Sequence, residues 1–212
     1  MKKTIFFTII LTIGVFISSF TKDKKDVSST IISTKEIAFV PTEKEISPIK
    51  KSVIPFVGKS FNGFKEALAF RESGGRYDIV SSFGYLGKYQ FGESTLKRFN
   101  IHDTEHFLEN SELQEDTFMA LCSLNKWVLR KEIGRKVGKK INGIEITESG
   151  ILAAAHLAGT GNIKEYLRTN GKYRFKDAFG SSMQHYLKKF GGYDTSIVEA
   201  NKNPKVLSLN PF

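Results

Sequence analysis

The sequence predicts a mainly helical α+β protein with one minor β-element. No proline lies between Pro55 and Pro204, so uninterrupted helices are permitted over most of the chain. Apolar residues recur at helical spacing in several segments of that span. Residues 77–91 differ from these segments, because they are rich in aromatic and β-branched residues and are interrupted by Gly84 and Gly87. This composition predicts a small hairpin or glycine-rich loop.

The expected helices follow one another along the proline-free span. Phe61–Glu72 has a helical spacing of apolar residues and is followed by Gly74, a residue type that commonly ends a helix. Ser111 and Gln114 match a capping box, which predicts the start of a long helix that ends near Gly134. The other expected helices are Ser94–Phe99, Ile151–Leu157 (capped by Thr147), Asn162–Arg168 and Ser181–Phe190.

The N-terminal residues carry signals for export. Two lysines precede an uncharged stretch at residues 4–20, which is typical of a secretory signal peptide. Its length is at the lower limit for a membrane-spanning helix, so an uncleaved anchor is the alternative. Residues 21–58 hold three of the five prolines and favour a flexible tether, with a short extra strand at residues 37–40 as the alternative. We therefore expect residues 59–212 to form one domain that works in the periplasm or cell envelope, either secreted or anchored.

The overall composition excludes several classes of protein. Hydrophobic residues make up 40% and charged residues 25%, which is unlike collagen, a fully disordered chain or a multi-span membrane protein. The net charge of +10 favours an anionic partner, such as nucleic acid, an acidic membrane or an acidic wall polymer. The single cysteine, Cys122, excludes an intramolecular disulfide and a multi-cysteine zinc site.

The end of the first expected helix carries the strongest candidate chemistry. Glu72 lies there beside the apolar residues 68–70. Apolar surface disfavours the charged form of a carboxyl group, and a glutamic acid that stays protonated can give a proton to a leaving oxygen. Nearby tyrosines offer flat faces of the kind that sugar rings stack against: Tyr77, Tyr85 and Tyr89.

Three motifs in this part of the chain resemble those of the lysozyme-like superfamily, especially the soluble lytic transglycosylase (SLT) type of peptidoglycan-cleaving domain. Members of that family carry a Glu-Ser pair at a helix end, then a Gly-x-x-Gln segment, and much later an Ala-Tyr-Asn-Ala-Gly segment. The corresponding segments here are Glu72-Ser73, Gly87-Lys88-Tyr89-Gln90 and residues 154–163, and the resemblance spans about residues 61–190. The sequence departs from the family pattern where His156 replaces tyrosine, Leu157 replaces asparagine and Tyr89 replaces methionine.

The resemblance implies a lysozyme-like fold with a small β-hairpin or loop element beside the catalytic helix. It also implies roles for individual residues: Glu72 is the sole acid and base, Gln90 holds the sugar or its acetamido group, and Ser73 supports Glu72. Ser81 is a weaker candidate for a polar contact. The other candidate substrate-binding residues are Tyr85, Tyr89, His156 and Tyr186. A buried helix histidine is the alternative for His156, and core packing is the alternative for Tyr186, as for Tyr166 and Tyr173.

The activity that the resemblance implies is cleavage of the β-1,4 bond between N-acetylmuramic acid and N-acetylglucosamine, with no metal or cofactor. The glutamic acid protonates the bridging oxygen and then takes a proton from the muramic acid 6-hydroxyl, which closes a 1,6-anhydro ring. Most glycosidases instead use two carboxylates. Asp78 and Glu93 are candidates for a second one, although turn and helix-start positions explain them more simply. If either positions a water, the enzyme is a lysozyme-type muramidase, which is a hydrolase.

Two hypotheses outside glycan cleavage stay open. One is a non-catalytic module that binds the cell wall or takes part in secretion. The other is a nucleic-acid binder, suggested by the basic run at residues 126–140, although export argues against it. The expected partner is therefore the glycan strand of peptidoglycan rather than nucleic acid, with residues 4–20 as a potential membrane tether.

Overall fold

The computed structural model describes residues 57–177 and 180–209. The expected export signal and nearly all of the expected tether lie outside these residues. α-Helices dominate the described part, and the small sheet formed by β1 and β2 is antiparallel, so the prediction of a mainly helical α+β class is confirmed. The elements are α2 (Phe61–Ser73), α3 (Glu93–Arg98), α4 (Thr104–Glu109), α5 (Ser111–Lys136), β1 (Lys140–Ile141), β2 (Ile144–Glu145), α6 (Glu148–Arg168), α7 (Met183–Lys189) and the 3-10 helix η1 (Leu207–Leu209).

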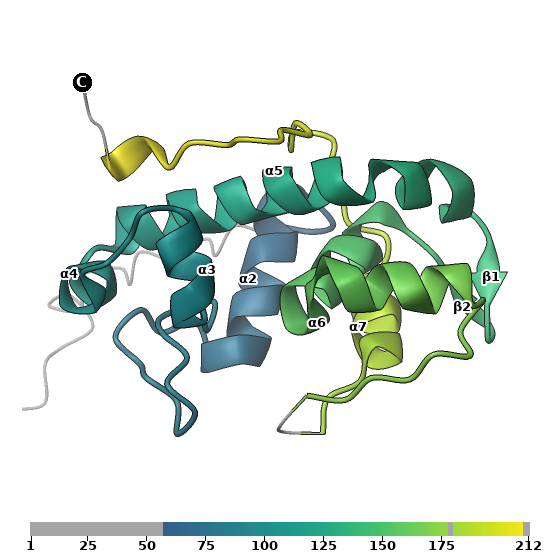
Figure 1. Cartoon of the computed structure of the whole chain (residues 1–212), viewed down its shortest axis with the longest axis horizontal. Helices are drawn as coiled ribbons and strands as arrows, with labels where there is room; N and C mark the ends of the chain where they lie inside the picture. Colours follow the sequence, from purple (N-terminus) through teal and green to yellow (C-terminus); the bar gives the residue numbers. More distant parts are fainter. Residues whose placement is uncertain (1–56, 178–179, 210–212) are drawn as a thin grey trace, which may run out of the picture. The chain divides into compact units, whose positions relative to one another are not determined.

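The long helix α5 organises the described domain. Figure 1 shows it running the length of the fold, with α2, α3 and α6 on one side and the C-terminal segment that ends in η1 along the other. Aromatic rings fill the space between α5 and the elements beneath it. Phe118 of α5 lies against Phe64 of α2 and stacks on Tyr89, with ring centroids 6.2 and 4.0 Å away. All three of these rings are fully buried, which makes this cluster part of the hydrophobic core.

Helix α2 is bounded by residues suited to each end. The Ser60 hydroxyl accepts a hydrogen bond from the Gly63 N–H, as an N-cap side chain does. Gly74 ends the helix with a φ of 71°, a left-handed conformation that glycine adopts without strain. Glu72 consequently lies in the last turn of a rigid helix, as the sequence predicts.

Two expectations for α5 are wrong. Asn110, not Ser111, is the N-cap, since its side-chain oxygen accepts from the Leu113 N–H. Gln114 takes no part in a capping box, because its amide is fully buried and hydrogen bonds to the backbone of Lys88 and Phe107. The helix also continues past Gly134 to Lys136.

The β-structure lies partly where the sequence does not predict it. Residues 77–91, expected to form a small hairpin or a glycine-rich loop, are a loop with isolated antiparallel bridges, Val80 to Leu86 and Leu86 to Phe91. The regular sheet is β1 and β2, which are joined by Asn142-Gly143. These two residues have φ values of 51° and 77°, and such a pair makes the tight turn that best fits a two-residue hairpin.

The C-terminal helices follow the expected order, with changes at their ends. The two helices expected at residues 151–157 and 162–168 form one element, α6, which kinks at Gly159, where φ is 79°. Helix α7 begins at Met183 after its N-cap Ser182, and α4, capped by Asp103, has no counterpart among the expected helices. Among the described residues, no helix has the length and apolar character that a membrane span requires.

Candidate active site

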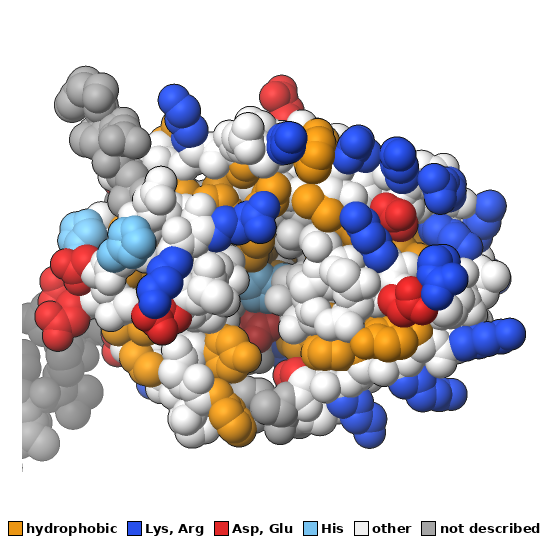
Figure 2. Space-filling model, in the orientation of Figure 1, with side chains coloured by type: hydrophobic (Ala, Val, Ile, Leu, Met, Phe, Trp, Pro, Cys, Tyr) orange, Lys and Arg blue, Asp and Glu red, His pale blue; other side chains and the backbone are white. Residues whose placement is uncertain are grey.

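A cleft of about 390 Å³ lies where the end of α2 faces the loop of residues 79–90, helix α6 and the start of α7. Figure 2 shows this face hollowed near its centre, with acidic and histidine side chains at the bottom of the hollow. Several of the residues that the sequence singles out line this cleft, although they come from distant parts of the chain. They are Glu72, Ser81, Tyr85, Gln90, His156 and Tyr186.

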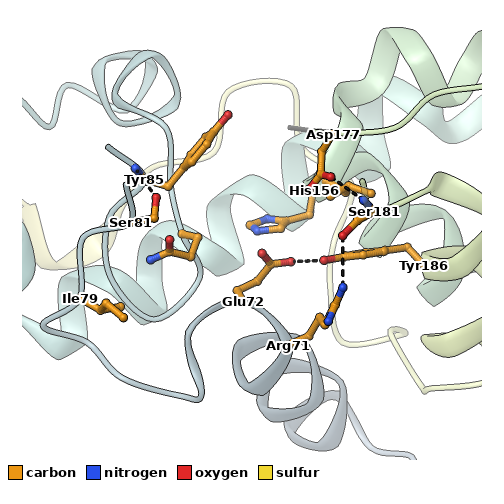
Figure 3. Close-up of a pocket in the computed structure, with 11 residues that line it drawn as sticks. Arg71, Glu72, Ile79, Ser81, Tyr85, His156, Asp177, Ser181 and Tyr186 are labelled. Carbon is orange, nitrogen blue, oxygen red and sulfur yellow. Dashed lines mark hydrogen bonds between the residues drawn. The ribbon is translucent and has the colours of Figure 1, made fainter. Parts of the chain in front are cut away.

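Glu72 lies in the middle of the cleft, between the loop that carries Ser81 and Tyr85 and the helix that carries Tyr186 (Figure 3). Its carboxyl group is held from one side, because the Tyr186 hydroxyl donates a hydrogen bond of 2.7 Å to Oε1. Burial, and next the negative charge of Glu72, raise the pKa of Tyr186, so this hydroxyl keeps its proton and acts as a donor. The second oxygen, Oε2, makes no hydrogen bond with any described residue. Oε2 is therefore the oxygen that can exchange a proton with a ligand.

Replacement of Tyr186 by phenylalanine tests whether the hydrogen bond to Glu72 contributes to turnover. Tyr186→Phe keeps the ring that packs on Phe190 at a centroid distance of 5.1 Å but removes the hydroxyl. We expect turnover of a glycan substrate to fall by about tenfold to a hundredfold, since a hydrogen bond to a charged group contributes about 1.5–3 kcal/mol. Circular dichroism should be unchanged. The matched control is Tyr173→Phe, which removes a hydroxyl bonded to Asn162 and should leave turnover at the wild-type rate.

Gln90 reaches the cleft from a tightly constrained loop. Its own φ is 51° and that of Gly87 is 72°. A Cβ on Gly87 would lie 2.2 Å from Oε1 of Gln114, so the loop packs too closely on α5 for any larger residue. The Gln90 side-chain nitrogen donates to the Gly87 carbonyl at 3.0 Å, which leaves the amide oxygen available to a ligand.

Ser73 and Tyr89 do not line the cleft. The Ser73 hydroxyl donates to the Lys88 carbonyl at 2.7 Å and accepts from the Arg76 N–H, so it joins the end of α2 to the Gln90 loop. It is a positioning residue rather than a substrate contact. Tyr89 was expected to offer its ring to a sugar, and this expectation is wrong, because the ring is fully buried against Phe118.

His156, which is partly buried, has features of both interpretations that the sequence left open. It lines the cleft from α6, and its Nε2 lies 2.8 Å from the Tyr89 carbonyl, a backbone partner of the kind expected for a buried helix histidine. Its ring also lies edge-on to Phe91 and Phe118. The histidine therefore ties α6 to the backbone of the Gln90 loop at Tyr89, one residue after the carbonyl that Ser73 binds.

Residues that were not among the expected substrate contacts complete the cleft. They are Arg71, Ile79, Leu157, Asp177 and Ser181. The Arg71 guanidinium donates to the Ser181 hydroxyl at 3.2 Å, and the Asp177 carboxylate accepts from the Ser181 N–H at 2.6 Å (Figure 3). Asp177 thus brings a second carboxylate to the cleft. The two carboxylates weighed in the sequence analysis are absent from its lining, since Asp78 is exposed and Glu93 pairs with Lys97 on the surface.

Beneath the Gln90 loop, a polar network centres on Glu115 of α5. Its carboxylate accepts from the ammonium groups of Lys65 and Lys88, at 2.6 and 2.7 Å, and from the hydroxyls of Tyr77 and Tyr89. Burial alone would raise the pKa of Glu115, but the hydrogen bonds from the two lysines outweigh it and lower the pKa to about 2. The Glu115 carboxylate therefore stays charged and holds the loop at Lys88, two residues before Gln90.

Comparison of the chain with protein-family models, curated proteins and solved structures finds no match. Among the described residues, no group of three or more His, Cys, Asp or Glu side chains could hold a metal ion. What the cleft can do chemically thus follows from its own residues. It offers the Glu72 carboxyl group, which Tyr186 holds, and the Gln90 amide on a constrained loop. A second carboxylate, that of Asp177, lies across the cleft from that loop.

Proposed function

We propose that this chain is an exported peptidoglycan lytic transglycosylase with a lysozyme-like fold and that Glu72 is its acid and base. The observation that carries the proposal is the Glu72 carboxyl group, which is half-buried in a cleft and held at one oxygen by Tyr186. The motif resemblance in the sequence supports the same assignment, since Glu72, Gln90 and His156, one from each motif, line that cleft.

The reaction would use Glu72 twice. Its protonated Oε2 gives the proton to the oxygen that bridges the two sugars, and the bond from that oxygen to the muramic acid C1 breaks. The acetamido group of the same sugar stabilises the positive C1. The Glu72 carboxylate then removes the proton from the 6-hydroxyl, whose oxygen bonds to C1 and closes the 1,6-anhydro ring. The acid is regenerated, and no water is consumed.

The lining of the cleft is suited to a sugar chain. Tyr85 is 41% exposed, so its ring is open to stacking against a sugar face. Ile79 and Leu157 add apolar surface, and the Gln90 amide oxygen can accept a hydrogen bond from an acetamido N–H. A cleft of apolar walls with a few fixed polar groups is typical of sites that bind small polar molecules.

The charge of the domain fits an anionic polymer. Figure 2 shows Lys and Arg side chains spread over the end of the molecule where α5 ends, which includes the basic run of residues 126–140. The peptide stems of peptidoglycan carry carboxylates, so a basic surface on the same face as the cleft would favour the approach of the polymer.

The test is digestion of purified peptidoglycan sacculi by the full-length chain. We expect soluble muropeptides to be released in proportion to time and to protein concentration. Sacculi that stay intact under these conditions, with a known muramidase as positive control, would leave the proposal without support and favour a non-catalytic wall-binding module.

Asp177 favours a second candidate, a muramidase on the same cleft. A second carboxylate could activate a water, and the product would then be a reducing end. The two candidates differ in what Asp177→Asn does. Hydrolysis through Asp177 predicts loss of muropeptide release, whereas the transglycosylase reaction predicts that most of the release persists, because Glu72 alone moves the protons.

A further inference from the structure

The cleft at Glu72 continues into a second cavity of about 340 Å³. Tyr85, Gln90, His156 and Leu157 line both, so one molecule could occupy the two at once. The second cavity extends from these shared residues between α3 and α5. The polar side chains that line only this cavity are Ser94, Thr95 and Arg98 of α3, Asn125 of α5 and Thr160 of α6.

Asn125 gives the second cavity a polar group that lacks a partner. The residue is 6% exposed, and its side-chain amide makes no hydrogen bond with any described residue. The amide is open to the cavity rather than sealed in the core, so a ligand in the cavity can reach it. Because an amide offers both a donor and an acceptor, a ligand with a peptide group could satisfy both.

Arg98 gives the same cavity an unpaired positive charge. Its guanidinium is exposed at the last residue of α3 and makes no ion pair or hydrogen bond within the described part of the chain. Its neighbour Lys97 is different, because it pairs with Glu93 at 2.7 Å. A free guanidinium beside a cavity suits a carboxylate, which it can bind through two parallel hydrogen bonds.

The walls of the cavity add a third feature. Leu121 and Val128 of α5 line it together with Asn125, so apolar surface flanks the free amide. Small apolar side chains joined by peptide groups, and ending in a carboxylate, would match all three features. A sugar chain without stems keeps only the lactyl carboxylates directly on its muramic acid rings, and it offers neither the peptide groups nor the stem carboxylates that these three features match.

We propose that the second cavity binds the acidic peptide stem of the glycan strand, with Arg98 on a stem carboxylate and Asn125 on a stem peptide group. This inference rests on the proposed function for its substrate, and it adds that the protein selects strands that carry stems. Strands from which the stems have been removed would still enter the Glu72 cleft but would lose the contacts to Arg98 and Asn125.

Equilibrium binding to full-length Glu72→Gln tests the proposal without cleavage of the ligand. The two ligands are a muropeptide tetrasaccharide with its stems and the same tetrasaccharide after removal of the stems by an amidase. We expect the stem-bearing ligand to bind about tenfold more tightly, which corresponds to about 1.4 kcal/mol. Adding Arg98→Gln should abolish that preference and leave the affinity for the stem-free ligand unchanged.

Two further variants make the test specific. Lys97→Gln removes the same charge from the neighbouring position and should keep the preference for stems. Asn125→Asp keeps the shape of the side chain but repels the stem carboxylates, so it should weaken the stem-bearing ligand more than the stem-free one. The proposal is overturned if both ligands bind equally, if neither binds, or if Arg98→Gln weakens both alike. If the wild-type chain leaves sacculi uncut but the stem preference is present, the catalytic assignment fails while the stem site stands.

Discussion

Replacing Glu72 by glutamine is expected to abolish glycan cleavage and leave the fold intact. The amide has nearly the shape of the carboxyl group, and the Tyr186 hydroxyl can still donate to its oxygen. Glutamine cannot give a proton to the bridging oxygen or take one from the 6-hydroxyl. Acid–base catalysis contributes about a hundredfold to ten-thousandfold in rate, and both proton transfers depend on Glu72 here. We therefore expect the release of muropeptides from sacculi to fall by about a thousandfold or more.

The matched control for this loss is Asp78→Asn. Asp78 is an exposed carboxylate six residues away in sequence that does not line the cleft. Its replacement should leave turnover unchanged, and circular dichroism should give the same helicity for both variants. Wild-type turnover by Glu72→Gln would remove Glu72 from the chemistry, and with it the transglycosylase assignment.

The largest expected effect on stability is that of Glu115→Gln. Lys88 has a side chain only 5% exposed, and Glu115 is its more buried acidic partner, at 2.7 Å. Without the Glu115 charge, the ammonium group keeps only the ion pair with Glu66, which is 53% exposed. Removing one partner of a buried ion pair costs about 3 kcal/mol, and chemical denaturation at pH 7 should show a loss of that order. The control Glu93→Gln breaks an ion pair on the surface and should have a much smaller effect.

The same variant predicts a dependence on pH. The pKa of Glu115 is about 2 in the folded protein, below the ordinary value of about 4.5. A carboxyl group with a lowered pKa stabilises the fold above its unfolded pKa, and that stability is lost as the pH falls through the folded value. The difference in unfolding free energy between wild type and Glu115→Gln should therefore be largest at neutral pH and shrink between about pH 4.5 and 2. A difference that stays constant over this range would mean that the Glu115 charge does not stabilise the fold.

The parts of the fold that the sequence predicts are those set by local contacts. Thr147 caps α6 as expected, because its hydroxyl accepts from the N–H three residues later. Ser182 caps α7 in the same way, one residue after the expected start of that helix. The start of α5 is ambiguous in the sequence, since Asn110 and Ser111 are both good caps. Gln114 does not form the capping box, because its side-chain oxygen accepts a hydrogen bond from the N–H of Lys88, which is 26 residues away. The β1–β2 hairpin has a clear local signal, Asn142-Gly143, although no strand was expected there.

The candidate site likewise contains residues that local motifs predict and residues that only the tertiary fold brings together. Glu72 and Gln90 were found from their motifs, and a loop that joins them brings both to one cleft. Asp177, Ser181, Arg98 and Asn125 reach that cleft or its extension from other elements, and no local pattern marks them. Tyr89 was assigned to the wrong environment because a tyrosine beside a glycine-rich turn is equally suited to a groove or a core. Its position over Phe118 depends on how α5 packs on the loop.

The most direct test of the central claim is the mass of the muropeptides released when the wild-type chain digests sacculi in water enriched in oxygen-18. If Glu72 transfers the proton of the 6-hydroxyl and O6 attacks C1, the products end in 1,6-anhydromuramic acid. They are then one water lighter than the hydrolysis products and contain no oxygen-18. Products with reducing ends that carry one oxygen-18 would contradict the account and assign the chain as a muramidase.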